Sequence, residues 1–352
     1  MSRSSSGMGT LARITLVTLA LLAAPLAPSA FAQMPNATQG AAASAAASAA
    51  SVAAQLVAAF DRVFKGPYPG ERAIHAKGIV LRGTFAADAA AATLTTAEHV
   101  QPDRGPVPVI VRFSDFSGMP AQGDGKPGAT PSGMAIKFQL PEDVDTDIVA
   151  HSFNGFPVGT AEAFLEYLNA LTTSDPAVRG AFFTDHPAAK QFVDAPKPVP
   201  VSYATDAYYG VDAFRFINAA AVGRFGRYRI EPVAGAHYLD TAQTAALKPD
   251  YLRDELPQRL ASGPVAFRLF VQLAEPGDVV TDPTVAWPAD RPQVLLGTLS
   301  LTAIVPPADP VTRTLFFSPM NLVPGIAASD DPLLAARTRS YAISYRRRLA
   351  KE

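Results

Sequence analysis

Residues 107–114 read VPVIVRFS and residues 133–140 read GMAIKFQL, and these two stretches decide the fold class. In both, apolar residues alternate with other residues, which is the period-two pattern of β-strands that bury one face. Gly, Pro and Asp punctuate the chain between such stretches, and these residues end strands and form turns. The two stretches therefore predict strands of a largely antiparallel sheet.

Comparable patterns recur along the chain at residues 78–85, 146–150, 213–219, 225–232, 264–273 and 294–304. A row of eight mostly antiparallel strands favours closure into a barrel, because a closed sheet has no exposed edge. Apolar residues at helical spacing predict helices at 52–65, within 160–200 and at 331–352. We therefore expect an α+β fold, an eight-stranded antiparallel β-barrel with accessory helices outside it.

The first 32 residues have the features of a secretory signal peptide. Arg3 and Arg13 give a positive start, residues 14–26 form an uncharged apolar run, and Ala30-Phe31-Ala32 offers small residues at a cleavage site. We expect cleavage after Ala32 and a periplasmic or secreted protein. An N-terminal membrane anchor is the alternative.

Residues 33–51 are mostly Ala, Ser and Gln, a composition with little to bury, so they predict a loose linker. The folded domain is expected at residues 52–352. The absence of cysteine excludes disulfides, thiolate metal sites and cysteine catalysis. A formal net charge of −1 provides no basic field for nucleic acid or for anionic lipid, so we expect neither as a partner.

Four groups of residues follow one another along the chain. They are ERAIHAKG at 71–78 with GTF at 83–85; VRFS at 111–114 with GMAIKF at 133–138; DPT at 282–284 with WP at 287–288 and GTL at 297–299; and LVPGI at 322–326 with RTRSY at 337–341 and RRRL at 346–349. In this order they resemble the catalase family and more closely its small members, the catalase-related peroxidases. The resemblance implies the catalase barrel, haem b with its iron as cofactor, and peroxide as substrate.

The last group resembles the segment that supplies the iron ligand, which would be Tyr341. Arg337 lies one helical turn before it, so both side chains share a helix face. A phenol is a poor ligand unless it is ionised, and a fixed cation favours the phenolate. Without the resemblance, an Arg and a Tyr at this spacing would indicate only an ordinary helix surface.

His75 matches the distal catalytic base of the family. Cleavage of peroxide requires a proton to move from the oxygen that binds iron to the oxygen that leaves, and a neutral imidazole can accept and then donate it. Ser114 matches the serine that helps to orient this histidine. A lone histidine without these neighbours would more often be structural.

Arg72, Arg112 and Arg348 match arginines that contact the haem propionates, and guanidinium groups suit partly buried carboxylates. Each is otherwise explained as a solvated charge at a strand end. Phe164 aligns with the aromatic residue that stacks on the haem, and plain core packing explains it equally well.

The sequence departs from the family at the distal asparagine. His151 occupies its place without a gap, and Asn154 occupies it with a short gap. An amide stays neutral whereas an imidazole titrates, so this departure puts efficient dismutation of peroxide in doubt. The sequence also ends soon after Tyr341, at residue 352. We therefore expect no NADPH site, and a monomer or small homo-oligomer.

These features favour a haem-dependent peroxidase that reduces hydrogen peroxide or organic peroxides with a small organic electron donor, in oxidative-stress defence. A true catalase and an enzyme that metabolises fatty-acid hydroperoxides are alternatives on the same fold. An alternative of another class is a non-enzymatic haem or lipid carrier that holds its ligand in the barrel mouth.

Overall fold

The computed structural model describes residues 37–351, so the predicted signal peptide lies outside the described residues. The chain divides between Ala43 and Ser44, and apart from the start of one helix the fold below is that of Ser44–Glu352. No helix within residues 37–351 is long and apolar enough to cross a membrane.

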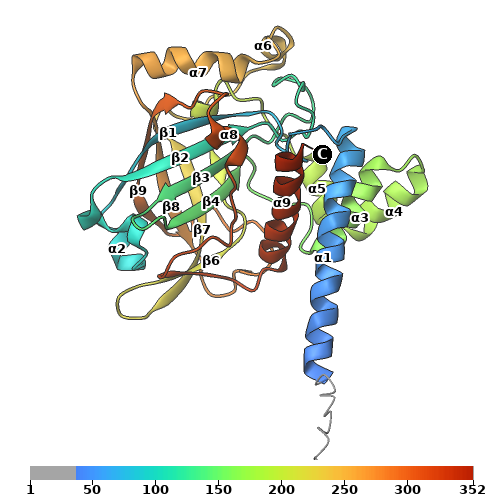
Figure 1. The fold of residues 1–352 in the computed structure, drawn as a ribbon, viewed down its shortest axis with the longest axis horizontal. Coiled ribbons are helices and arrows are strands. Elements are labelled where there is room, and N and C mark those ends of the chain that lie inside the picture. Colours follow the sequence, from blue (N-terminus) through green and yellow to red (C-terminus); the bar gives the residue numbers. More distant parts are fainter. Residues whose placement is uncertain (1–36, 352) are drawn as a thin grey trace, which may run out of the picture. The chain divides into compact units, whose positions relative to one another are not determined.

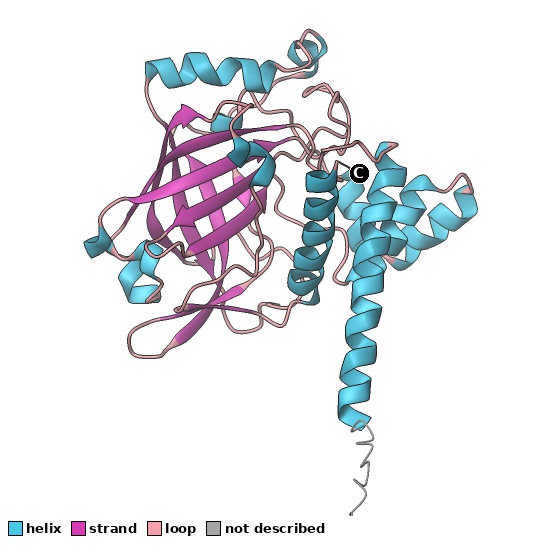
Figure 2. Ribbon diagram, viewed as in Figure 1, coloured by secondary structure: helices cyan, strands magenta, loops and turns pink. Residues whose placement is uncertain are grey.

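The strands of the described residues form one antiparallel sheet (Figure 2). Its order is β10-β6-β7-β5-β4-β3-β2-β1-β9-β8, and an added pairing of β7 with β8 closes the ring. The predicted eight-stranded barrel is therefore confirmed. Its ring consists of β1, β2, β3, β4, β5, β7, β8 and β9. The strands are β1 Gly78–Ala87, β2 Val107–Ser114, β3 Gly133–Gln139, β4 Asp145–His151, β5 Tyr208–Tyr209, β6 Phe214–Ile217, β7 Gly223–Pro232, β8 Val265–Leu273, β9 Gln293–Ile304 and β10 Ile326–Ala328.

One predicted strand has a different place from the one expected. The stretch 213–219 corresponds to β6, which pairs with β7 and β10 and lies outside the ring. The missing ring member is β5, whose Tyr208 and Tyr209 pair with Ile230 and Arg229 of β7. Because β7 has ten residues, β5 and β6 can pair with successive parts of its length.

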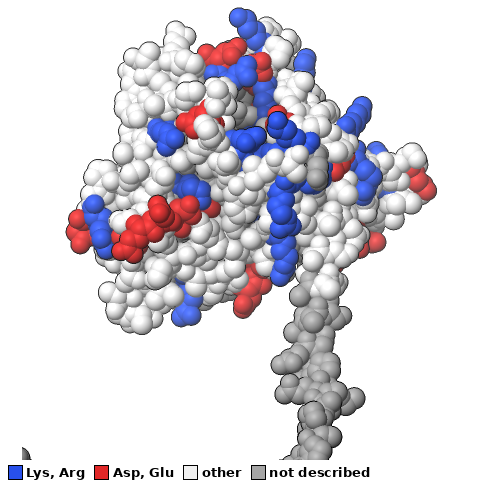
Figure 3. Space-filling model, in the orientation of Figure 1, with Lys and Arg blue, Asp and Glu red and all other residues white. Residues whose placement is uncertain are grey.

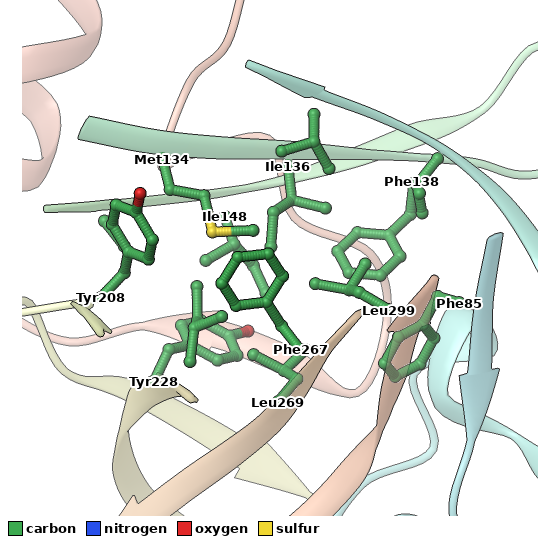
Figure 4. Close-up of a cluster of buried hydrophobic side chains, with 14 of the residues drawn as sticks. Phe85, Met134, Ile136, Phe138, Ile148, Tyr208, Tyr228, Phe267, Leu269 and Leu299 are labelled. Atoms are coloured by element: carbon green, nitrogen blue, oxygen red, sulfur yellow. The ribbon is translucent and has the colours of Figure 1, made fainter. Parts of the chain in front are cut away.

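The barrel interior is a packed aromatic and aliphatic core (Figure 4). Phe113 stacks on Tyr203 with ring centroids 5.4 Å apart, and Phe85 meets Phe138 edge-on at 5.3 Å. His99 is buried in the same core, 4.6 Å from the ring of Phe138. Side chains thus fill the interior, as is typical of barrels with this number of strands.

The predicted helical regions are confirmed, and they lie beside the barrel (Figure 1). Residues of α1, α3 and α9 share a second apolar cluster that includes Leu56, Phe60, Leu168 and Ala336. The main helices are α1 Ala37–Phe64, α3 Ala161–Thr172, α4 Pro176–Asp185, α5 Pro187–Asp194, α7 Tyr251–Ser262 and α9 Pro332–Ala350, and short ones are α2 Ala91–Leu94, α6 Thr241–Ala245 and α8 Pro310–Thr314.

Helix α1 begins at Ala37, well before the predicted start at residue 52. Residues 37–51, predicted as a loose linker, are therefore helical in the structure. Alanine has the highest intrinsic helix propensity, and it dominates this stretch. The prediction weighed the lack of residues to bury and neglected this propensity.

Candidate active site

A cavity of about 200 Å³ lies against the outer face of β2, β3 and β4. In the register of these strands, Ser114, Gly133 and His151 form one row, and Arg112, Ala135 and Val149 form another. These rows alternate with residues that point into the barrel core, because successive side chains of a strand face opposite sides. The outer rows therefore supply the barrel-side wall of the cavity.

Helices α1, α3 and α9 supply the facing walls. The α9 residues in the lining recur every three or four positions, so one face of that helix lies along the cavity. They are Leu333, Ala336, Arg337, Ser340, Tyr341, Ser344, Tyr345 and Arg348. The opposite face of α9 is exposed at Arg339 and Arg346, and Figure 3 shows basic side chains in a column over this helix.

The structure brings nearly all the predicted site residues to this one cavity. Asn154 is the exception, since it does not contribute to the lining. Between the two candidates for the distal asparagine position, the structure thus places His151 at the cavity. The predicted residues in the lining are Arg72, His75, Arg112, Ser114, His151, Phe164, Arg337, Tyr341 and Arg348.

The ring of His75 is held by its Nδ1 atom. Nδ1 lies 2.7 Å from the backbone oxygen of Asp115 and 3.1 Å from Oγ of Ser114. A carbonyl oxygen only accepts hydrogen bonds, so Nδ1 carries the proton and Nε2 has a free lone pair. Burial, with the nearby Arg112 guanidinium, lowers the pKa of His75 to about 3, so the imidazole is neutral near pH 7.

The backbone of His75 has a positive φ of 57°, an uncommon conformation for a residue with a side chain. Two further hydrogen bonds fix it. The His75 nitrogen donates to the Phe116 oxygen at 3.2 Å, and Nη2 of Arg112 donates to the His75 oxygen at 2.9 Å. Arg112 is therefore also a support for the backbone of the candidate base.

Two glycines of the sequence motifs, Gly133 and Gly78, make room for the side chains of Ser114, His75 and Arg112. A Cβ on Gly133 would lie 2.7 Å from Oγ of Ser114 and 2.9 Å from the His75 ring. A Cβ on Gly78 would lie 2.6 Å from Nη2 of Arg112. Any side chain at either position would displace a group of the candidate site.

The carbonyl that anchors His75 belongs to a residue that is itself fixed. The buried Asp115 side chain accepts a hydrogen bond of 2.7 Å from the Tyr203 hydroxyl, and the Asp115 nitrogen donates to the Lys77 oxygen at 3.2 Å. Burial, and then the charge of Asp124, raises the pKa of Asp115 to about 7. The imidazole is thus attached to the packed barrel and not to a mobile loop.

His151 is the second imidazole of the barrel-side wall. Burial and the charge of Arg337 lower its pKa to about 3. An exposed histidine would titrate near pH 6.5, but buried His151 remains neutral near pH 7. Within residues 37–351, its Nδ1 and the side-chain oxygen of Asn154 are buried without a hydrogen-bond partner.

Tyr341 and Arg337 form a pair on the opposite wall. Nε of Arg337 donates to the Tyr341 hydroxyl at 3.2 Å, as the four-residue spacing predicts. Nη1 of Arg337 donates to the carboxylate of Asp212, which is buried between β5 and β6. Burial alone lowers the pKa of Arg337, but Asp212 and Tyr341 more than reverse this effect, so the guanidinium is firmly charged.

Asp212 is a site residue that sequence reasoning missed, and a second carboxylate, Asp331, lies beside it. Burial, and then the charge of Asp212, raises the pKa of Asp331 to about 7. Asp331 also caps α9, because its side chain accepts from the Leu333 nitrogen at 2.9 Å. Asp331 therefore both caps the start of α9 and lies beside the Asp212–Arg337 ion pair.

Arg72, Arg112 and Arg348 converge at one end of the cavity. Nη2 of Arg72 and Nη2 of Arg348 donate to the same oxygen, that of Leu315, at 3.1 and 2.8 Å. Burial and mutual repulsion lower the pKa of Arg72 well below its usual range, and burial lowers that of Arg112 to about 10. Glu71 is near enough to counter this effect, yet among the described residues the three arginines form no ion pair.

Phe164 lines the cavity and also belongs to an aromatic cluster. Its ring centroid lies 5.3 Å from that of Phe156 and 5.7 Å from that of Phe60. Both interpretations of this residue, a surface for a flat ligand and core packing, thus agree with its position.

Comparison with known proteins agrees with this fold. The sequence pattern of the catalase family matches residues 52–352. The chain therefore belongs to the catalase family. A fungal catalase of known structure has the same fold, with a TM-score of 0.69 and 23% identity over 81% of this chain and 60% of that chain.

Two small relatives match over nearly their whole length. The chain is 38% identical to a catalase-related peroxidase of Mycolicibacterium paratuberculosis, with 80% of this chain and 90% of the relative covered. It is 33% identical to a catalase-related peroxidase of Synechococcus elongatus, with 84% and 88% covered.

Proposed function

We propose that this protein is an exported, haem-dependent peroxidase that reduces hydrogen peroxide or small organic peroxides with electrons from an organic donor. Its role would be defence against oxidative stress. The similarity to two catalase-related peroxidases supports this activity. The observation that carries it is the fixed tautomer of His75, a neutral base in the same cavity as the Tyr341–Arg337 pair. Export rests on the features of residues 1–32.

The residues present fit haem, a flat, largely apolar dianion. Three arginines without an ion pair among the described residues suit its two carboxylates. The Tyr341 hydroxyl, paired with a charged guanidinium, suits an iron ligand. Apolar side chains of α1 and α3, such as Leu56, Phe60 and Phe164, suit the faces of the macrocycle. When bound, haem iron supplies the redox chemistry that cleaves the oxygen–oxygen bond.

His75 would move the proton that this cleavage requires. Nε2 would accept the proton from the peroxide oxygen nearer the iron. It would then return this proton to the other oxygen, which leaves as water or alcohol. The bond from Nδ1 to Asp115 keeps the ring in one orientation through both transfers. Oγ of Ser114 also contacts Nδ1, and Gly133 leaves room for the ring because it has no side chain.

Tyr341 would hold the cofactor from the opposite wall. Arg337 donates to the phenol oxygen and therefore stabilises a negative charge on it. Asp212 keeps Arg337 in place and charged. His151, neutral and close to His75, would give the bound peroxide a second hydrogen-bonding group.

The test is the visible spectrum of the purified, haem-reconstituted protein before and after one equivalent of hydrogen peroxide. We expect a ferric spectrum that changes with peroxide and returns when a phenolic donor is added. Oxygen release at a high rate without any donor would instead support a true catalase. A protein that does not bind haem would overturn the proposal and favour a carrier of some other ligand.

A further inference from the structure

A second, more open hollow of about 610 Å³ lies farther along the outer face of β3 and β4, and we call it the side groove. Its floor includes Lys137, Asp145 and Asp147. Its other walls come from residues 311–321 and from Thr338 of α9. The proposed function assigns no role to this groove.

Only a thin wall separates the side groove from the cofactor cavity, since Leu315 and Phe316 line both. The Leu315 oxygen is the acceptor shared by Arg72 and Arg348. The Phe316 ring lies 5.2 Å from the ring of Tyr345, and the Arg348 guanidinium lies 5.1 Å from that ring. A molecule in the groove would thus lie one layer of side chains from the arginines proposed to hold the carboxylates of haem.

The floor of the side groove has an excess of negative charge. One cation, Nζ of Lys137, is shared between Asp147 at 2.8 Å and Asp145 at 2.9 Å. Asp147 is buried, whereas the Asp145 side chain is 40% exposed. A groove ligand can therefore reach a carboxylate of Asp145 but meets no unshared cation among the groove residues.

Apolar side chains also line the groove. They include Val311, Phe316 and Met320, and Met320 is exposed. An aromatic ring can pack against these side chains while its hydroxyl or amino group donates to Asp145. An anionic donor would be repelled by the floor, because like charges oppose binding.

The side groove lies next to the cofactor cavity and has an acidic floor. On this basis, and resting on the proposed function, we propose that the side groove binds the electron donor. We further propose that the donor is a neutral or cationic aromatic phenol or amine. Two donor molecules each lose one electron and one proton. The two electrons and two protons convert one hydrogen peroxide into two molecules of water.

The first test fills the groove in the haem-loaded protein. Thr314 is exposed and lines the groove, so Thr314→Trp would occupy it. Its neighbour Arg313 is exposed on the same helix and does not line the groove, so Arg313→Trp is the matched control. With 2-methoxyphenol as donor, we expect Thr314→Trp to raise KM at least about tenfold and Arg313→Trp to leave it unchanged.

Two further readouts separate binding from catalysis. Saturation-transfer NMR should show 2-methoxyphenol bound to the wild type and to Arg313→Trp, with the signal lost in Thr314→Trp. The initial reaction with peroxide, followed by absorbance without donor, should be the same in all three proteins. That result would show that the cofactor site is intact.

A second variant tests the charge and does not depend on how well a tryptophan is accommodated. Asp145→Asn removes the accessible negative charge. We expect the ratio of kcat/KM for o-phenylenediamine to that for a disulfonated dye to fall by about fivefold. An unchanged ratio would show that Asp145 does not select the donor.

Failure of this inference is distinguishable from failure of the proposed function. If the wild type oxidises 2-methoxyphenol and Thr314→Trp does so with the same KM and NMR signal, the groove is not the donor site and the peroxidase proposal stands. If the wild type consumes peroxide but does not oxidise 2-methoxyphenol, o-phenylenediamine or the disulfonated dye, the peroxidase proposal itself is wrong. The groove inference is then wrong with it.

Discussion

The two walls of the cavity handle charge in opposite ways. On the barrel side, His75 and His151 are buried imidazoles whose pKa values are lowered to about 3, so this wall has no charge on its candidate catalytic groups near pH 7. On the α9 side, Arg337 is held charged between Asp212 and Tyr341. The barrel wall is therefore suited to moving a proton, and the helix wall to stabilising a fixed negative charge.

The difference follows from the elements that build each wall. The carbonyl that fixes the His75 ring belongs to Asp115, the residue directly after β2, so the barrel backbone itself holds this imidazole. On α9, Arg337 and Tyr341 lie one helical turn apart, and the long Arg337 side chain reaches Asp212, which is 125 positions away in the sequence. The variants below test this division from the largest expected effect to the smallest.

The change with the largest effect is Tyr341→Phe, on the helix wall. It removes the proposed iron ligand and keeps the ring. We expect loss of haem after gel filtration, or a visible spectrum that shows a changed iron ligand. A variant with wild-type haem content and spectrum would show that the helix wall does not supply the ligand.

On the barrel wall, His75→Ala should keep haem but lose the base. We expect the rate of peroxide cleavage, measured by stopped-flow absorbance, to fall about a hundredfold or more, the usual scale for a lost proton-transfer group. His237→Ala is the control, because His237 is exposed and, within the part of the chain that the structure describes, its ring hydrogen-bonds only to the Ala234 oxygen. A similar rate in both variants would remove His75 from the mechanism.

A smaller effect is expected from Asp212→Asn, which weakens the support of Arg337. Outer-shell partners of a metal ligand typically contribute 10- to 100-fold in affinity, so we expect haem affinity to fall about tenfold. Asp331→Asn is the comparison, because asparagine can still cap α9 and, among the described residues, the ion pair of Arg337 is with Asp212. Equal affinities in the two variants would contradict the special role of Asp212.

The smallest effect concerns His99, a buried imidazole remote from both walls, whose pKa burial lowers to about 3. Between about pH 6.5 and 3 the unfolded chain binds a proton there and the folded chain does not, so the unfolding free energy falls as the pH falls. We expect His99→Leu to reduce this slope by up to about 1.4 kcal/mol per pH unit in denaturant titrations. Equal slopes would show that burial does not set this pKa.

The sequence predicts the residues that line the two cavity walls better than the residues that hold those side chains in place. Arg337 and Tyr341 are close in sequence, and His75 lies in a motif, so pattern and resemblance find them. Asp212 contacts Arg337 from more than a hundred residues away, and a single aspartate in a loop follows no period. Gly133 was visible in its motif, but its reason is steric and appears only when the neighbouring strand is placed.

The barrel shows the same limit. Long strands such as β2 and β9 have enough residues for alternation to appear, and their positions were predicted. β5 has two residues, Tyr208 and Tyr209, which contain no period at all. Helix α7 was not predicted, and it contains Pro257, a residue that removes a backbone hydrogen bond from a helix interior.

The order of the cavity walls along the chain has a consequence for biosynthesis. All strands of the ring precede residue 305, whereas α9 begins at Pro332. A ribosome therefore completes the barrel wall, with His75 in it, before it makes the residue proposed to bind iron. Nascent chains that stop short of α9 would contain the proposed base without the proposed ligand, so the proposed cofactor could be bound through Tyr341 only after the last part of the chain has been made.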